Sequence, residues 1–255
     1  EDIIFVAESH ALLLIANAIS SKDKGNGIYK YGFNKERIRT VYRMGVSILS
    51  GYRSFIRFFV RYLFLCVYSF SKQGDNLQKV SVIIDSYIFE DSFDKNGKFT
   101  NKYFSELHEC LSANGFTVGV LGIFYNISLK RIKFIFKSIY RGETKFVLLE
   151  NCLTLIDYVT ILIYPLKRLG CFEKVHAFLG IDVQPLVNEE NLVKINSPNS
   201  ISALLLHKLP RRLHEKGINP DVYINWSENQ LIHRGMISGV YKYLRKTKVI
   251  GGKPF

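Results

Sequence analysis

The sequence lacks the short motifs that most directly identify an enzyme class. It contains no GxxxxGK(S/T) phosphate loop, no GxGxxG fingerprint, no GxSxG nucleophile elbow and no HExxH zinc motif. These absences argue against P-loop NTPases, dinucleotide enzymes with that fingerprint, hydrolases with that elbow and HExxH zinc proteases. Evidence of function must therefore come from other residues.

Cysteine is scarce and is not arranged for metal binding. The chain has no CxxC pair and no cluster of Cys and His with metal-ligand spacing, so we expect no metal site. We expect the cysteines to be buried and reduced, as in a cytosolic protein. They are Cys66, Cys110, Cys152 and Cys171.

Uninterrupted apolar runs long enough to span a membrane are also missing. The nearest candidate is 145–170, in which Glu150 and Asp157 interrupt the hydrophobic residues. An ionised carboxylate in lipid costs several kcal/mol, so a buried helix ending at Pro165 and Gly170 is favoured over a membrane helix.

Acidic residues are outnumbered by basic ones. The 255 residues include 35 Lys and Arg against 22 Asp and Glu, a formal net charge of +13. Such a surplus favours a polyanionic partner, which means nucleic acid, anionic lipid or a phosphorylated substrate. Composition does not choose among the three.

The segment "GYRSFIRFFVRYLFLCVYSFSK" (51–72) combines basic and aromatic residues. Three arginines recur every four residues and so share one helix face, and the uncharged run that follows is too short to span a bilayer. We expect a basic amphipathic helix lying on an anionic membrane surface. The alternative is a helix packed on the sheet with solvated arginines, and both can hold for one helix. The predicted membrane contacts are Arg53, Arg57, Arg61, Phe58 and Phe59.

Strand-like and helix-like segments alternate along most of the chain, which predicts a Rossmann-like parallel sheet flanked by helices. We expect one such domain over residues 1–247, with a basic helical insertion at about 30–72. Because the chain has no initiator Met or signal peptide and stops at "GGKPF", we expect a fragment, with 248–255 beginning a linker to a second domain. The expected strands are 3–8, 80–89, 116–125, 221–226 and 248–252. The expected helices are 9–20, 101–115, 128–140, 196–217 and 228–245.

Polar residues gather where the expected strands end. In parallel α/β sheets, ligands bind beyond the carboxyl ends of the strands, so these residues would share one rim. They are Glu8 and His10 after the first strand, Asp85 and Tyr87 in the second, Tyr125 at the end of the third, and Trp226 with the residues that follow it.

The stretch "NWSENQLIHRG" (225–235) has two interpretations. Ser227 and Gln230 form a capping box, which together with Glu228 in the first turn explains the stretch as a helix start. Yet Asn229 and His233, four residues apart, would face inward at the rim, where buried polar groups need partners. Two glycines, Gly235 and Gly239, predict a smooth strip on this helix that another element can approach closely.

A family resemblance rests on two segments. "INWSENQLIHRGMISGVYKYLRKTKVIGG" (224–252) resembles the W-x-E-N-Q segment of bacterial glycosyltransferases that build capsule and lipopolysaccharide chains, although Ser227 stands where that family usually has an aromatic residue. "SVIIDSYIF" (81–89) resembles their earlier strand, which carries an aspartate. The resemblance covers residues 80–255 and implies one half of a GT-B architecture, in which two Rossmann-like domains face a cleft.

The resemblance, together with the rim argument, defines the candidate site. Glu228, Asn229 and Gln230 match the family motif, and Asp85 matches its strand aspartate. We expect Glu228 and Asp85 to be catalytic. The expected substrate-binding residues are Asn229, Gln230, His233, Tyr87, Glu8 and His10.

The resemblance also implies a function. We expect the amino-terminal, acceptor-binding half of a glycosyltransferase that acts on a surface polysaccharide or lipid-linked glycan at the inner face of the bacterial inner membrane. This chain would bind no cofactor, because the sugar nucleotide belongs to the second domain, and no nucleic acid is expected as a partner. The alternatives are a basic nucleic-acid-binding α/β protein and a non-catalytic interaction domain of the same fold.

Overall fold

The computed structural model describes the chain at 33–68, 77, 79–104, 106–125, 127–168, six single positions from 183 to 194, 197–226 and 230–252. The chain forms two compact units, residues 1–55 with 162–201 and residues 56–161 with 202–255. Several predictions lie outside the described residues: the strand at 3–8, the helix at 9–20, and the site candidates Glu8, His10, Glu228 and Asn229.

The second unit contains a five-stranded sheet in which all neighbouring strands run parallel, in the order β3-β2-β1-β4-β5. The prediction of a Rossmann-like α/β fold is confirmed. This order reverses direction between β1 and β4, and in open α/β sheets such a reversal is where ligands bind. The strands are β1 Val82–Ile88, β2 Val118–Phe124, β3 Lys145–Leu148, β4 Val222–Trp226 and β5 Lys248–Gly252.

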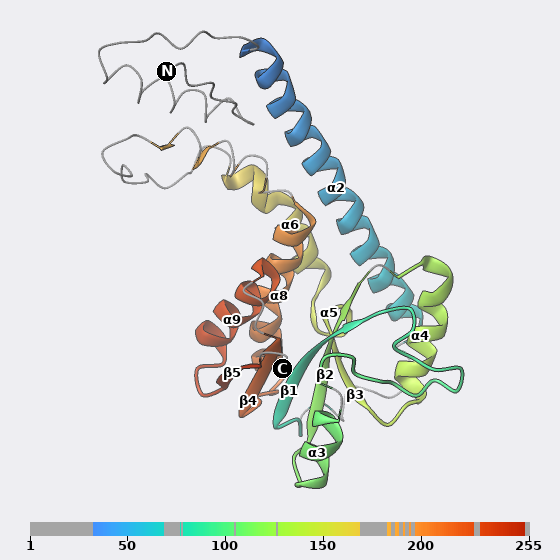
Figure 1. Cartoon of the computed structure of the whole chain (residues 1–255). Helices are drawn as coiled ribbons and strands as arrows, with labels where there is room; N and C mark the ends of the chain where they lie inside the picture. The colour runs from blue at the N-terminus through green and yellow to red at the C-terminus, as the bar shows by residue number, and fades with distance from the viewer. Residues whose placement is uncertain are drawn as a thin grey trace, which may run out of the picture. The chain divides into compact units, whose positions relative to one another are not determined.

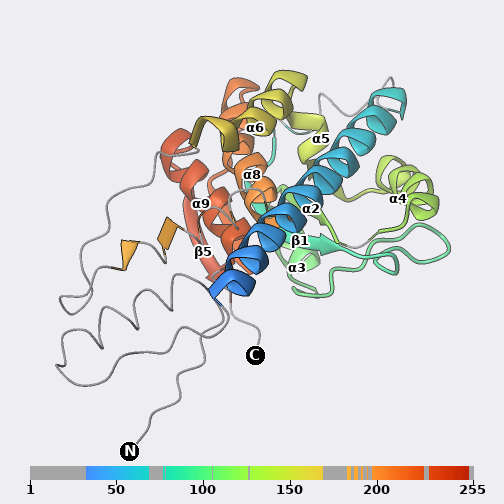
Figure 2. The ribbon, with the colours of Figure 1, turned by 90° about the horizontal axis from the view of Figure 1, so that it is seen from above.

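Helices cover both faces of the sheet (Figures 1 and 2). Helices α3 (Leu107–Ala113) and α4 (Leu129–Arg141) follow β1 and β2 and pack on one face. Helices α8 (Pro198–Glu215) and α9 (Leu231–Tyr243) precede and follow β4, on the other face. Helices lie between consecutive parallel strands, because joining such strands requires a long crossover that usually contains a helix.

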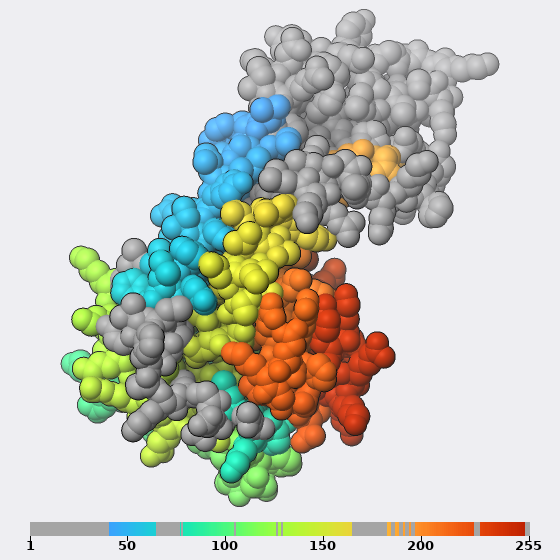
Figure 3. Space-filling view, turned by 180° about the vertical axis from the view of Figure 1, so that it is seen from behind, coloured from blue at the N-terminus to red at the C-terminus, as the bar shows by residue number. Residues whose placement is uncertain are grey.

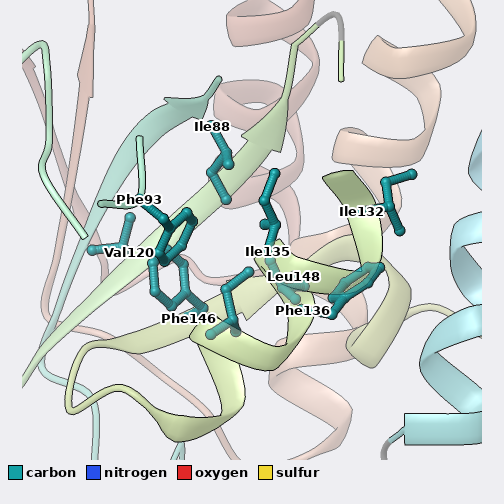
Figure 4. Packing of buried hydrophobic residues seen from close by; sticks show 9 residues of the cluster. Ile88, Phe93, Val120, Ile132, Ile135, Phe136, Phe146 and Leu148 are labelled. Carbon is teal, nitrogen blue, oxygen red and sulfur yellow. The ribbon is translucent and has the colours of Figure 1, made fainter. Parts of the chain in front are cut away.

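A cluster of buried apolar residues lies between β1, β2, β3 and α4 (Figure 4). The α4 sequence places its apolar residues on one face and its lysines and arginines on the other, which is exposed. Burying each large apolar side chain contributes about 1.5–3 kcal/mol to stability. The buried cluster consists of Ile88, Phe93, Val120, Ile132, Ile135, Phe136, Ile139, Phe146 and Leu148.

The predicted single helix over 145–170 is wrong. The segment forms β3, then the short α5 (Leu149–Cys152), then α6 (Leu155–Arg168). A short apolar run does not distinguish a buried strand from a buried helix by periodicity, which is why the strand was missed. Pro165 lies inside α6 instead of ending a helix, while Pro210, expected within a helix, lies inside α8.

The two acidic residues of this segment are buried and paired with arginines in the second unit. Glu150 Oε1 lies 3.2 Å from the Arg61 Nε atom, and Asp157 accepts hydrogen bonds from Arg212 at 2.7 and 3.0 Å. Such partners within the protein are what a buried carboxylate requires. None of the helices in the described part of the chain has the length and apolarity to cross a membrane.

The predicted last strand at 248–252 is confirmed. It is β5, which pairs with β4 from Val222 to Trp226, so these residues belong to the sheet and not to the predicted linker. The prediction of buried cysteines holds for Cys152 but is wrong for Cys110, which is exposed; both are free thiols. The basic segment around residues 30–72 is helical, as α2 (Phe33–Tyr68), and its last part belongs to the second unit.

The predicted glycine strip on α9 is confirmed. A Cβ atom at Gly235 would lie 2.3 Å from the carbonyl oxygen of Ala203 on α8, and one at Gly239 would lie 2.6 Å from that of His207. Both distances are far shorter than a van der Waals contact. The atoms that the added Cβ would meet belong to the backbone of α8, so they cannot move aside locally. The two helices therefore pack this closely because both positions lack a side chain.

We expect Gly235→Ala to lower the free energy of unfolding by about 1–3 kcal/mol, because the added methyl group forces α8 and α9 apart. The matched control is Gly45→Ala in α2, where a Cβ atom meets nothing within 4 Å. That change should leave stability unchanged or raise it by about 0.5–1 kcal/mol, since alanine favours helix more than glycine does. Urea denaturation measures both, and equal effects would contradict the close packing.

Candidate functional site

Asp85, in the middle of β1, lies at the point where the strand order reverses. Its side chain is 2% exposed. One carboxylate oxygen accepts a hydrogen bond from the Trp226 backbone N–H at 2.8 Å, and the other accepts one from the Tyr223 hydroxyl at 3.2 Å. Both donors belong to β4, so this one carboxylate joins the two strands that flank the reversal.

The local pairing of the strands explains why a side chain is needed here. β1 and β4 pair in register only from Val82 with Val222 to Ile84 with Ile224. One residue further along β1, the Asp85 side chain accepts the Trp226 N–H in place of a backbone carbonyl. The Trp226 N–H is thus satisfied by a side chain at the point where the ladder between these strands ends.

Burial raises the pKa of Asp85 to about 7, and the hydrogen bonds from Trp226 and Tyr223 offset only part of that rise. Removing a carboxylate from water disfavours its charged form, whereas donors that face it favour that form. A carboxyl group with a pKa near neutrality can both hold and release a proton at physiological pH. This property is what a general acid or base requires.

His233 of α9 faces the same carboxylate. Its Nε2 atom lies 3.7 Å from the Asp85 Oδ2 atom, and its side chain is also 2% exposed. The predicted inward orientation of His233 is therefore observed. Two titratable side chains, from a strand and from the helix across the reversal, thus lie close together inside the second unit.

Tyr87 and Gln230 form a second link between β1 and the start of α9. The Tyr87 hydroxyl donates a hydrogen bond to Gln230 Oε1 at 3.1 Å, and Gln230 itself is exposed. The predicted capping box is wrong for Gln230, because α9 begins at Leu231 and the Gln230 side chain makes no capping bond. This side chain contacts Tyr87 instead, so it lies at the solvent-facing end of the site.

Four of the predicted site residues are therefore brought together: Asp85, Tyr87, Gln230 and His233. Glu228 and Asn229 lie outside the described residues, but Trp226 and Gln230, on either side of them, both contact β1. Among the described residues, no group of three His, Cys, Asp or Glu side chains could hold a metal ion.

Sequence reasoning missed Tyr223, Phe89 and Tyr103. Tyr223 pairs in register with Ile83, so its hydroxyl can reach Asp85, two residues further along β1. Strand register depends on the tertiary structure, so the local sequence does not reveal this contact. Tyr103 was assigned to a helix, but the Asn101 side chain accepts hydrogen bonds from the backbone N–H groups of Tyr103 and Phe104 and holds a turn there. The helix begins only at Leu107.

Five aromatic residues form a continuous set of ring contacts at this edge of the sheet. We call Tyr87, Phe89, Tyr103, Tyr125 and Trp226 the aromatic cluster. Tyr87 lies 5.6 Å from Tyr103 and 5.8 Å from Tyr125 between ring centres, and Tyr103 lies 4.4 Å from Trp226. Phe89 contacts Tyr125 at 5.6 Å and Tyr103 at 6.2 Å. Such offset and edge-to-face pairs stabilise one another beyond simple burial.

The predicted membrane contacts on α2 divide into two groups. Arg53 and Arg57 are exposed, whereas Arg61 is buried against Glu150 with its guanidinium 4.4 Å from the ring centre of Phe58. Arg61 is therefore not a surface contact, because the buried Glu150 carboxylate needs a cation beside it.

Phe58 and Phe59 are only half-buried, but their rings have partners within the second unit. Phe59 stacks on Tyr62, which in turn contacts Tyr158 of α6. The alternative of core packing therefore holds for residues 58–62 of α2.

The most exposed apolar residues of α2 are not the predicted Phe58 and Phe59 but lie nearer its start. At about 100° per residue, Tyr42, Val46, Leu49 and Arg53 fall on one face of the helix. Tyr42 is 70% exposed and Leu49 72% exposed, which are large values for apolar side chains. This part of α2 presents an apolar face bordered by a basic residue.

Comparisons of the chain with protein-family models, with curated proteins and with solved structures found no match. A functional assignment therefore depends on the geometry of the site and on the sequence segments described above.

The raised pKa of Asp85 predicts a pH dependence of stability. An acid whose folded-state pKa (about 7) exceeds its unfolded value binds its proton more tightly when folded, so its contribution to stability falls as pH rises from about 4 to about 7. Asp85→Asn, which does not ionise, should show a smaller decline over this window in urea denaturation at pH 4.5 to 8.

Other groups also titrate in this window, such as Glu150, whose pKa is raised by burial. Their effect on stability is the same in the original protein and in Asp85→Asn, so it cancels in the difference between the two. Parallel stability curves for the two proteins would show that Asp85 titrates normally.

Proposed function

We propose that the chain is the acceptor-binding half of a glycosyltransferase that transfers a sugar from a nucleotide donor to a surface polysaccharide or lipid-linked glycan. The observation that carries this proposal is the buried Asp85 carboxyl group, with a pKa of about 7 and His233 beside it, at the strand-order reversal of a parallel sheet. The resemblance of "SVIIDSYIF" and "WSENQ" to capsule and lipopolysaccharide glycosyltransferases supports the same function.

The two ends of the site suit two tasks. In glycosyl transfer to a hydroxyl group, a base takes the hydroxyl proton as the oxygen attacks the anomeric carbon. We assign proton transfer to the buried end, where Asp85 and His233 face each other, together with Glu228 from the sequence motif. At the exposed end, the Gln230 amide, which the buried Tyr87 hydroxyl holds by a hydrogen bond, supplies a polar group for sugar hydroxyl groups.

The rest of the proposal concerns the donor and the place of action. The sugar nucleotide would be bound by a second Rossmann-like domain, as in the GT-B proteins that the chain resembles, and this chain would bind no cofactor itself. The reaction would take place at the inner face of the bacterial inner membrane, where polyprenyl-linked glycans are found. The exposed apolar face of α2 with its neighbouring arginines supports contact with anionic lipid.

Glycan binding is testable with the intrinsic fluorescence of Trp226, which is the single tryptophan of the chain and donates its backbone N–H to Asp85. We expect a saturable change in emission on titration with polyprenyl-diphosphate-linked sugars or surface-polysaccharide oligosaccharides. Gln230→Ala should weaken binding about fivefold, since one hydrogen bond in a polar site contributes about 1 kcal/mol.

Asn114→Ala is the matched control, because it removes an exposed amide at the end of α3 that leads into β2, away from the site. Absence of binding to every glycan by the folded protein would overturn the proposal. Saturable binding of random oligonucleotides with a steep salt dependence would favour the nucleic-acid-binding alternative.

Membrane contact is testable by sedimentation with liposomes that contain anionic phospholipid. Because each basic residue near such a surface contributes about 1 kcal/mol, reversing Arg53 and Arg57 to Glu should weaken binding at least about thirtyfold. The matched control reverses Lys242 and Arg245, which are exposed on and just after α9. An equal loss in both variants would show a general charge effect instead of a contact through α2.

A further inference from the structure

The aromatic cluster is built in two layers. Tyr87 and Trp226 are buried, at 8% and 9% exposure, whereas Phe89 and Tyr103 are half-buried and Tyr125 is 58% exposed. The inner rings hold the outer rings through the contacts of Tyr87 with Tyr103 and Tyr125, at 5.6 and 5.8 Å, and of Trp226 with Tyr103, at 4.4 Å. An outer ring of this kind keeps one face open to solvent while its position is fixed from behind.

Tyr125 is the most open ring and is firmly placed. It follows β2 directly, and its backbone N–H donates to the carbonyl of Ile88, the last residue of β1, at 2.9 Å. The neighbouring ring of Phe89 already has the Lys102 ammonium group 5.3 Å from its centre. A ligand that stacks at this edge therefore meets Tyr125 first, and a pre-positioned ring loses little entropy on binding.

Polar groups suited to hydroxyl recognition lie directly beside this ring. The Tyr87 ring contacts Tyr125 on one side and lies 6.2 Å from the His233 ring on another, and its hydroxyl group bonds to Gln230. Small-molecule sites combine apolar or aromatic surface with a few placed polar groups in this way. A pyranose ring matches both parts, because it has an apolar C–H face and hydroxyl groups around its edge.

We propose that Tyr125, supported by the rings of Tyr87 and Phe89, forms a stacking subsite for one sugar ring of the glycan acceptor, next to the Tyr87–Gln230 pair. The subsite rests on the proposed function and specifies where the acceptor lies. It places a sugar ring over the carboxyl end of β2, with its hydroxyl groups toward the end of β1 and the start of α9. The ring would be oriented by stacking and by hydrogen bonds together.

The test is oligosaccharide titration followed by Trp226 fluorescence, with the variants Tyr125→Ala and Tyr125→Phe. Stacking on an aromatic side chain makes a contribution that corresponds to at least about tenfold in affinity, so Tyr125→Ala should weaken binding by that factor. Tyr125→Phe should bind as the original protein does, because the ring is retained. Tyr241→Ala, which removes a tyrosine of similar exposure (65% against 58%) from α9, is the matched control and should have no effect. Helix α9 lies at the surface of the molecule (Figure 3).

The outcomes separate the subsite from the function as a whole. If glycans bind and Gln230→Ala weakens them but Tyr125→Ala does not, the stacking subsite is wrong and the proposed function stands. If no glycan binds the original protein, the function itself fails. Binding of uridine or guanosine that depends on the Tyr125 ring would show a nucleobase platform and overturn the assignment to a sugar ring.

Discussion

The hydrogen bonds between Asp85 and β4 are the interaction on which the rest of the site depends. One carboxylate accepts the Trp226 backbone N–H and the Tyr223 hydroxyl, and in doing so replaces the backbone pairing that β1 and β4 no longer make beyond Ile84. Because the hydrogen-bond ladder between β1 and β4 ends at Ile84, side chains instead of paired backbone occupy the space beyond it. Burial strengthens these hydrogen bonds. It also raises the pKa of the Asp85 carboxyl group, so the link between the strands and the raised pKa have the same cause.

Two other buried acids of the second unit are each paired with an arginine. Glu150 is paired with Arg61, and Asp157 with Arg212, within segments whose sequences are otherwise strongly apolar. Burial raises the pKa of Asp157, but the bonds from Arg212 and Thr154 bring it below its ordinary value. Each acid thus marks where a cation from a distant segment packs, and Arg61 is one such cation although its sequence context resembles a surface residue.

The candidate site has a buried end and an exposed end. Asp85 and His233 are enclosed, while Gln230 and Tyr125 are exposed, and Tyr87 connects the two groups through one hydrogen bond and several ring contacts. A substrate held at the exposed end would be oriented by groups that are themselves fixed by the fold.

The sequence by itself determined the parallel α/β fold, the β1 aspartate, the inward-facing His233 and the close approach at Gly235 and Gly239. These features follow from local periodicity and from residue size, which short stretches of sequence express. Only the tertiary structure decided that 145–148 forms a strand, that Gln230 bonds to Tyr87, that Tyr223 reaches Asp85 and that Arg61 is buried. Each of these depends on strand register or on a partner far along the chain, and pairing between distant residues leaves no periodic signal in the sequence around either one.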